Sequence, residues 1–151
     1  MARIGIITCS NCTQECNCAS VVCLGDLRKR RGFFAPYPQD EPLELIGIIN
    51  CAGCPTAAAP EKILRRVRAI AEFKVEALHL SFCMTVICPF IKKYVQLIKK
   101  AYPEIKLVMG THQPTEKERF TSGVKELLCQ TLAAPKTMSD MIKGTIKIPQ
   151  K

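Results

Sequence analysis

The chain has 151 residues, 48% of them hydrophobic, with 10 cysteines and a formal net charge of +9. Its length suits one domain that can bury a core without help from disulfides or metals, so fibrous and wholly disordered classes are excluded. No apolar run approaches the roughly 18 residues of a membrane span, and the first residues do not form a signal peptide. We therefore expect a soluble cytoplasmic protein with no membrane partner.

The first part of the chain predicts two buried strands, because isoleucine and leucine follow one another with few breaks in both segments. The second strand is almost continuously apolar, which suits a parallel strand covered on both faces. Between them, apolar residues at helical spacing end in Arg, Lys and Gly32, the usual close of a helix. The predicted elements are a strand at 3–8, a cysteine-rich loop at 9–18, a helix at 19–31, a loop at 33–42 and a strand at 43–50.

The second part continues the same alternation. Pro60 fits the first position of a helix whose apolar residues form one stripe, and Pro103 stops the next helix. After the last strand the pattern changes to one amphipathic helix and a weakly patterned end. The predicted elements are a helix at 60–73, a strand at 77–81, a helix at 88–101, a strand at 105–109 and a tail helix at 115–132.

Strands that alternate with helices indicate an α/β fold with a parallel sheet and right-handed crossovers. We predict a three-layer sandwich of Rossmann-like or flavodoxin-like type, with at least four strands in the order 2-1-3-4 rather than 3-2-1-4. This domain spans residues 1–112. Residues 113–151 are a helical C-terminal extension that covers the sheet, serves as a homodimer arm or stays partly disordered.

The cysteines carry the functional signal. A reducing cytoplasm keeps thiols reduced, so their number indicates metal or redox chemistry rather than disulfides. In a parallel sheet all carboxyl ends of the strands lie at one edge, where open α/β sheets bind their ligands. Cysteine or histidine follows each predicted strand, so we expect one metal or cluster at this edge. The expected ligands are Cys9, Cys51, Cys54, Cys83 and Cys88, with Cys12, Cys16, Cys18 and His112 as further metal-ligand candidates.

Thiolate and imidazole donors select zinc, copper(I) or iron–sulfur clusters. Cys54-Pro55 and Cys88-Pro89 are typical of cluster-binding segments, although proline also suits a first helical turn. Two C-x-x-C pairs and one histidine match a four-coordinate zinc site instead. We favour an iron–sulfur cluster with a redox or electron-transfer role and a redox partner protein, and we keep zinc as the alternative.

Two other functions are weaker. A thiol–disulfide oxidoreductase would use the pair Cys51 and Cys54 at a helix start and would leave the remaining cysteines idle. A basic nucleic-acid module with a zinc ribbon would use the Lys and Arg clusters. However, metal-bound thiolates would cancel much of the net charge, and only 6% of residues are aromatic. No motif identifies a hydrolase or a nucleotide site, so enzymatic activity is left open. Cys23 and Cys129 fit core positions, and His79 fits a hydrogen-bonded residue inside a strand.

Six short segments form a distinctive combination along the chain. They are Arg3-Ile4-Gly5-Ile6-Ile7 with Cys9, Gly32-Phe33-Phe34 with Tyr37, Cys51-Ala52-Gly53-Cys54-Pro55, His79-Leu80-Ser81-Phe82-Cys83, Cys88-Pro89 and Gly110-Thr111-His112. In these segments the chain resembles the CGGC-domain family, small prokaryotic proteins described as metal-binding, with zinc suggested from their Cys and His content. The resemblance covers residues 3–112 and implies a metal site but no particular reaction. Ala52 replaces the first central glycine, and the chain from Gln113 onward lies outside the resemblance.

Overall fold

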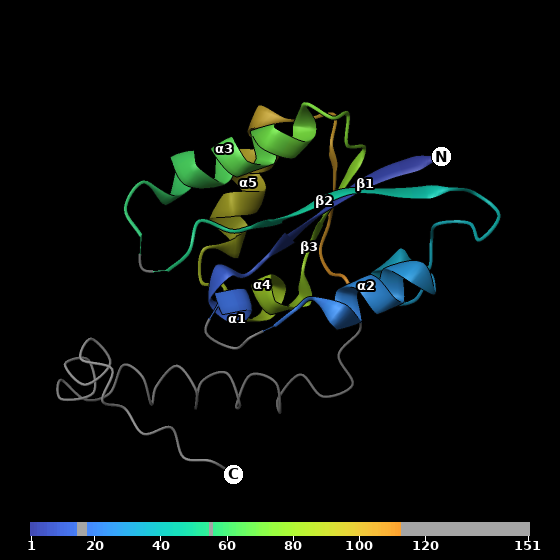
Figure 1. Ribbon diagram of the computed structural model, residues 1–151. Coiled ribbons are helices and arrows are strands. Elements are labelled where there is room, and N and C mark those ends of the chain that lie inside the picture. The colour runs from blue at the N-terminus through green and yellow to red at the C-terminus, as the bar shows by residue number, and fades with distance from the viewer. Residues whose placement is uncertain (15–17, 55, 113–151) are drawn as a thin grey trace, which may run out of the picture. The chain divides into compact units, whose positions relative to one another are not determined.

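A four-stranded parallel sheet forms the centre of the molecule. The computed structural model describes residues 1–14, 18–54 and 56–112, all of which belong to the unit Met1–Thr115. The strands are β1 (Ala2–Thr8), β2 (Leu43–Asn50), β3 (Ala77–Leu80) and β4 (Lys106–Val108). Every neighbouring pair is parallel and the order is β2-β1-β3-β4, which confirms the predicted topology (Figure 1).

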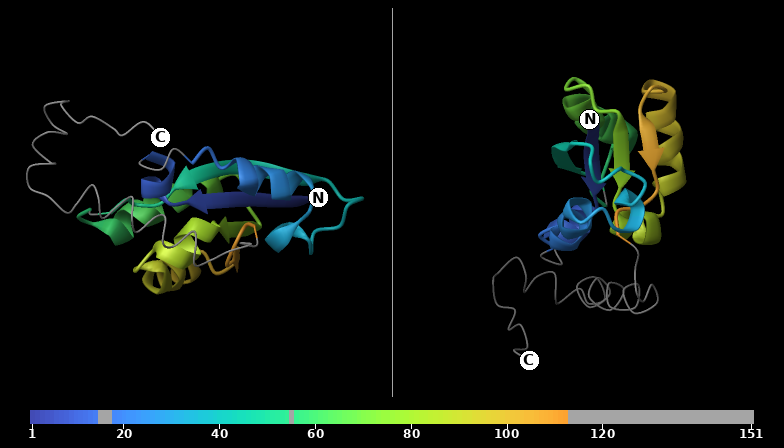
Figure 2. Two further views of the ribbon diagram at one scale, coloured as in Figure 1. Left: turned by 90° about the horizontal axis from the view of Figure 1, so that it is seen from below. Right: turned by 90° about the vertical axis from the view of Figure 1, so that its right-hand side faces the viewer.

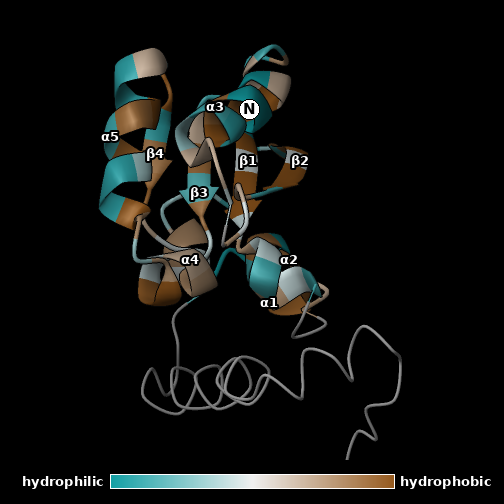
Figure 3. Ribbon diagram, turned by 90° about the vertical axis from the view of Figure 1, so that its left-hand side faces the viewer, coloured by the Kyte–Doolittle hydropathy of each residue, from teal (hydrophilic) through white to brown (hydrophobic). Residues whose placement is uncertain are grey.

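Helices cover both faces of this sheet, as predicted (Figure 2). On one face lie α3 (Ala59–Ala71) and α5 (Ile91–Ala101), which also contact each other. On the other lie α2 (Val21–Arg28) and the short 3-10 helix η1 (Gly32–Phe34). Figure 3 shows hydrophobic and hydrophilic residues alternating along α5, the pattern of a helix with one face on a core.

The alternation of side chains along β1 divides the core into two clusters. Ile7 packs with residues of α3, α5 and β3, whereas Ile4 and Ile6 pack with Leu27 of α2 and Phe34 of η1. Successive side chains of a strand point to opposite faces, so one apolar strand supplies both clusters. No helix among the described residues is long and apolar enough to cross a membrane.

Two predicted elements differ from the structure. β2 is an edge strand with only partly buried side chains, and Ile48 is 38% exposed. Its apolar character had predicted a strand covered on both faces, and the central strand β1 has that position instead. The predicted helix at 19–31 is shorter, because Ser20 has a left-handed backbone (φ 57°) and α2 begins only at Val21. Val22, one of the apolar residues whose helical spacing predicted this helix, is exposed rather than directed to the core.

Two short helices were missed at the carboxyl edge of the sheet. The predicted loop at 9–18 contains α1 (Ser10–Gln14), and α4 (Phe82–Ile87) follows β3 directly. Cys88 then has an extended backbone that separates α4 from α5. Helices of five and six residues are too short to show a clear apolar period. The predicted tail helix at 115–132 and Cys129 lie outside the described residues.

His79 is a fully buried polar residue on the face covered by α2 and η1. Its Nδ1 donates to the carbonyl oxygen of Gly110 at 2.9 Å, so its Nε2 is left to accept a hydrogen bond from the Tyr37 hydroxyl, also at 2.9 Å. The ring stacks on Phe34 with centroids 4.4 Å apart. The role predicted for His79, a hydrogen-bonded structural histidine, is therefore confirmed. Burial lowers the pKa of His79 to about 4.

We expect the free energy of unfolding to fall as the pH drops from 6.5 towards 4. In this window the unfolded chain protonates His79 while the folded chain does not, which removes up to about 3 kcal/mol. The measurement is urea unfolding of the wild type and of His79→Gln at several pH values. The free energy of unfolding of the variant should change less with pH over this window. Equal slopes in both proteins would show that His79 does not cause the loss of stability.

Two single substitutions, one in β1 and one in β2, test the packing of α3 on the sheet. Gly5 and Gly47 are register partners, but a Cβ atom on Gly5 would lie 2.5 Å from Cδ1 of Ile70, whereas one on Gly47 would meet nothing within 4 Å. We expect Gly5→Ala to lower the free energy of unfolding by about 1–3 kcal/mol through overpacking. Gly47→Ala should be neutral or slightly stabilising. Urea unfolding at one pH compares the two variants, and similar losses in both would show that α3 does not press on Gly5.

Candidate metal centre

Three segments that are distant in sequence bring four cysteines to the carboxyl edge of the sheet, where Figure 1 shows α1 and α4 beside each other. Cys9 follows β1, Cys12 lies one turn later in α1, Cys51 follows β2, and Cys83 lies in the first turn of α4. The ladder continues into this region, because the Cys51 N–H donates to the carbonyl of Thr8 at 2.8 Å. Extension of the sheet past β1 and β2 thus holds the Cys51 loop beside Cys9.

These four thiols interact in one series. Hydrogen bonding with the thiols of Cys12 and Cys51 shifts the pKa of Cys9, and the thiol of Cys12 interacts in the same way with Cys83. Cys12 and Cys51 are buried, whereas Cys9 and Cys83 are partly exposed. The described cysteines are all free thiols. The site therefore has two sulfurs inside the core and two that reagents can reach.

Cys9 is the sulfur best stabilised as an anion. The thiol of Cys12, then that of Cys51 and the backbone N–H groups of Cys12 and Asn11 donate to it, and together they lower the pKa of Cys9 to about 2. The pKa values of the donating thiols shift in the opposite direction. Sharing one proton with Cys83 and Cys9 raises the pKa of Cys12, and donation to Cys9 raises that of Cys51. Cys9 is therefore a thiolate that accepts hydrogen bonds from the neighbouring thiols.

Cys83 is the second sulfur that ionises readily. Its pKa is lowered to about 7, first by donation from Cys12 and also by the Ser81 hydroxyl, which lies 2.9 Å from the sulfur. Burial acts in the opposite direction. Cys9 and Cys83, one at each side of Cys12, are thus the two positions where negative charge collects.

The loop that carries Cys51 is fixed by neighbouring side chains. The Ser10 N–H donates to the Cys51 sulfur at 3.3 Å, and the Ser10 hydroxyl donates to the Cys51 carbonyl at 2.8 Å. The guanidinium of Arg66, from α3, donates to the carbonyls of Asn50 and Cys51. These contacts tie the Cys51 loop to both α1 and α3.

Ala52 stands where the C-G-G-C motif has its first glycine, and the backbone of this loop explains why alanine is tolerated there. Gly53 has φ +87°, a conformation that side chains disfavour, and its N–H donates to the Cys51 sulfur. Ala52 is buried and does not have a positive φ. The second glycine is therefore the one that the turn requires, and alanine at the first leaves the turn intact.

Cys54 and Cys88 lie near these four thiols but are not part of their hydrogen-bonded series. Burial raises the pKa of Cys54 and of Cys88, and the negative charge of Cys9 raises both further. Cys54 is exposed, and its carbonyl accepts a hydrogen bond from the Asn11 side chain at 3.3 Å. Both sulfurs are thus near enough to interact electrostatically with the contacting thiols.

His112 lies in a different group. Its Nδ1 is 3.6 Å from the Cys23 sulfur and 3.3 Å from the Thr111 hydroxyl, and its ring packs on Phe82 with centroids 5.2 Å apart. Cys23 is buried, as predicted, but it faces this polar pair rather than a purely apolar core. Cys18 is exposed, and Cys16 lies outside the described residues.

Sequence reasoning missed several residues that shape the site. Ser10 and Arg66 position the Cys51 loop, and Ser81 donates to Cys83. Ser10 and Ser81 are adjacent or close to ligand candidates, so their positions could have signalled a role. Arg66 belongs to a basic run whose members look alike in sequence, and only the packing of α3 distinguishes it.

In the described part of the chain, no three or more His, Cys, Asp or Glu side chains are placed so that they could hold a metal ion as they stand. The thiols interact in a series rather than around a common point. Binding would therefore require rotation of side chains, which the partly exposed Cys9 and Cys83 have room to make. The donor chemistry fits a soft metal, because four sulfur donors are available and one of them, Cys9, is already stabilised as a thiolate.

The family assignment agrees with this geometry. The model of the CGGC domain matches residues 3–112, which include the whole described sheet and every thiol of the centre, so the chain belongs to the CGGC domain family. Membership in this family supports metal binding. No curated protein and no solved structure matches the chain.

Thiol alkylation of the reduced, metal-free protein tests the charge distribution. Cys9, with a pKa of about 2, should react with iodoacetamide at a rate that is nearly constant from pH 5 to pH 9, because it is already a thiolate. Cys54 is exposed but has a raised pKa, so its rate should still be rising at pH 9. Peptide mass spectrometry measures both rates in one sample. A rate at Cys9 that rises tenfold per pH unit would show that the thiols do not stabilise it.

Proposed function

We propose that the protein binds a single soft metal ion, with zinc as the best fit, through Cys9, Cys12, Cys51 and Cys83. The observation that carries the proposal is that the ends of β1 and β2 and the helices α1 and α4 bring these four thiols to one edge of the sheet, where they shift one another's pKa values. Sulfur ligands of one tetrahedral zinc ion, each about 2.3 Å from the metal, are themselves only about 4 Å apart. Thiols that already interact at one edge would reach that arrangement by side-chain rotation, with the metal replacing the protons they share.

An iron–sulfur cluster, which the sequence favoured, would use a wider set. A four-iron cluster is larger than one ion, so its cysteine ligands stand further apart than contacting thiols. The surrounding thiols of Cys54 and Cys88, together with Cys9 and Cys83, interact through their charges without touching. This wider set supports the cluster as the second candidate, with a redox or electron-transfer role and a partner protein.

Thiol–disulfide exchange has less support at the pair first considered. Cys51 hydrogen-bonds with Cys9 and Ser10, whereas Cys54 is exposed, so the two thiols of this C-x-x-C segment have separate surroundings. Cys9 and Cys12 are in contact and combine a thiolate with a thiol of raised pKa, which is the better redox pair. That pair would still leave Cys51 and Cys83 without a role.

Single Cys→Ser variants distinguish these functions. For a single zinc ion, Cys9→Ser, Cys12→Ser, Cys51→Ser and Cys83→Ser should each weaken the metal affinity by more than the roughly 10- to 100-fold that loss of an outer-shell partner causes. Cys18→Ser, at an exposed cysteine, is the matched control and should retain the affinity. Chelator competition measures the affinity, and far-UV circular dichroism checks that the fold persists.

Metal analysis after anaerobic purification completes the test. Zinc in a 1:1 ratio in a colourless protein, dependent on Cys12 but not on Cys88, supports the single-ion site. Iron and sulfide in a brown protein that requires Cys54 and Cys88 but not Cys12 would replace it with the cluster. A protein without bound metal, with a reversible Cys9–Cys12 disulfide, would contradict both metal sites.

A further inference from the structure

The hydroxyl of Tyr94 is a buried polar group that no described residue satisfies. Tyr94 comes from α5, is 1% exposed, and its Oη has no hydrogen-bond partner within the described ranges. A buried hydroxyl left without a partner costs about 1–3 kcal/mol. An unpaired group of this kind indicates a missing ion, water or ligand-dependent partner.

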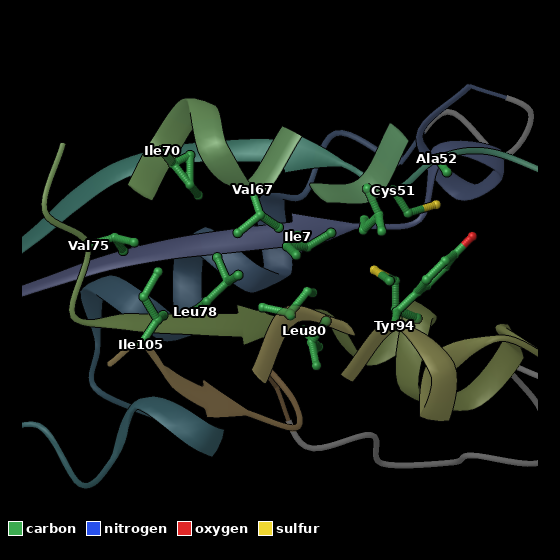
Figure 4. Packing of buried hydrophobic residues seen from close by; sticks show 13 residues of the cluster. Ile7, Cys51, Ala52, Val67, Ile70, Val75, Leu78, Leu80, Tyr94 and Ile105 are labelled. Carbon is green, nitrogen blue, oxygen red and sulfur yellow. The ribbon is translucent and has the colours of Figure 1, made fainter. Parts of the chain in front are cut away.

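The surroundings of this hydroxyl identify the partner. The Tyr94 ring belongs to the same buried cluster as Cys51, and Cys9 and Cys88 pack against that cluster. Figure 4 shows the hydroxyl at the far end of the ring, directed towards the segment that carries Cys51 and Ala52. Burial raises the pKa of Tyr94 to about 12, and negative charge on Cys88, Cys54 and Cys51 adds to the shift. The hydroxyl thus stays protonated at neutral pH and is a donor facing thiols.

We propose that Tyr94 donates a hydrogen bond to the Cys51 sulfur when Cys51 binds the metal as a thiolate, an inference that rests on the proposed function. Among the three thiols that act on Tyr94, Cys51 is the buried one. Cys54 is exposed and can be solvated by water, and Cys88 receives the N–H of Phe90. A buried thiolate needs protein donors, because water cannot reach it.

Tyr94 is therefore a positioning residue that tunes the metal site through its ligand. The Cys51 sulfur already receives the N–H groups of Ser10 and Gly53, and the phenol adds a third donor. Donors to a coordinated sulfur withdraw electron density from it and fix its orientation. In the metal-free protein the Cys51 thiol keeps its proton and donates a hydrogen bond to Cys9, so its sulfur carries little charge and is a weak acceptor for the phenol.

The test uses the full-length protein loaded with cobalt(II), whose thiolate-to-metal charge-transfer absorption reports the electron density on sulfur. Tyr94→Phe removes only the hydroxyl, so it should shift this absorption to lower energy and weaken the metal affinity roughly tenfold. The urea stability of the metal-free variant should be unchanged or higher, because an unpaired buried hydroxyl is lost. The matched control is Tyr37→Phe. Its hydroxyl bonds to His79 on the other face, so this variant should lose stability and keep the wild-type absorption.

Each outcome has a distinct meaning. A wild-type protein without the thiolate-to-cobalt absorption would refute the proposed function and this inference with it. A wild type that shows the absorption, with Tyr94→Phe identical in spectrum and affinity, would refute the inference alone. Equal loss of metal-free stability and of metal affinity in Tyr94→Phe would show that Tyr94 only supports the fold. If that variant does not fold, 3-fluorotyrosine at position 94, a more acidic donor, should shift the absorption to higher energy, and no shift would refute the inference.

Discussion

Parallel pairing of β1 with both of its neighbours is the constraint on which the site depends. It points the carboxyl ends of β1, β2 and β3 in one direction, so the residues that follow them meet at one edge. Ladder hydrogen bonds continue beyond the strands, from the Cys51 N–H to Thr8 and from the Ser81 N–H to Ile7. A sheet with one antiparallel strand would have separated the same cysteines by the length of a strand.

The chemistry of the site follows from burying several thiols together. A buried thiolate is costly unless donors surround it. Here the negative charge is placed on Cys9 and Cys83, each of which receives backbone and side-chain donors, while Cys12 between them keeps its proton. A divalent metal stabilises the same charge more strongly than shared protons can. This explains how a stable apolar fold can hold the eight described cysteines as free thiols, and why metal binding is the function that best fits them.

The two faces of the sheet divide the roles of stability and function. On the face of α2 and η1, His79 is fully hydrogen-bonded and stacked on Phe34, so its polar atoms are satisfied within the fold. On the face of α3 and α5, Tyr94 has a buried donor that no residue of the described ranges accepts, close to the thiols. Two buried polar aromatic side chains of similar depth thus differ in whether the described part of the chain completes their hydrogen bonds.

The sequence by itself determined the alternation of strands and helices, the parallel sheet and the edge to which Cys9, Cys51 and Cys83 are delivered. These features depend on apolar periodicity and on chain direction, and both can be read from short stretches of the sequence. Only the tertiary structure decided that Cys12 joins Cys9, that His112 faces Cys23 instead, and that Arg66 and Tyr94 face the cysteine loops. The physical reason is that side-chain contacts depend on short helices, such as α1 and α4, and on the packing of distant elements. Neither leaves a periodic signal in the chain.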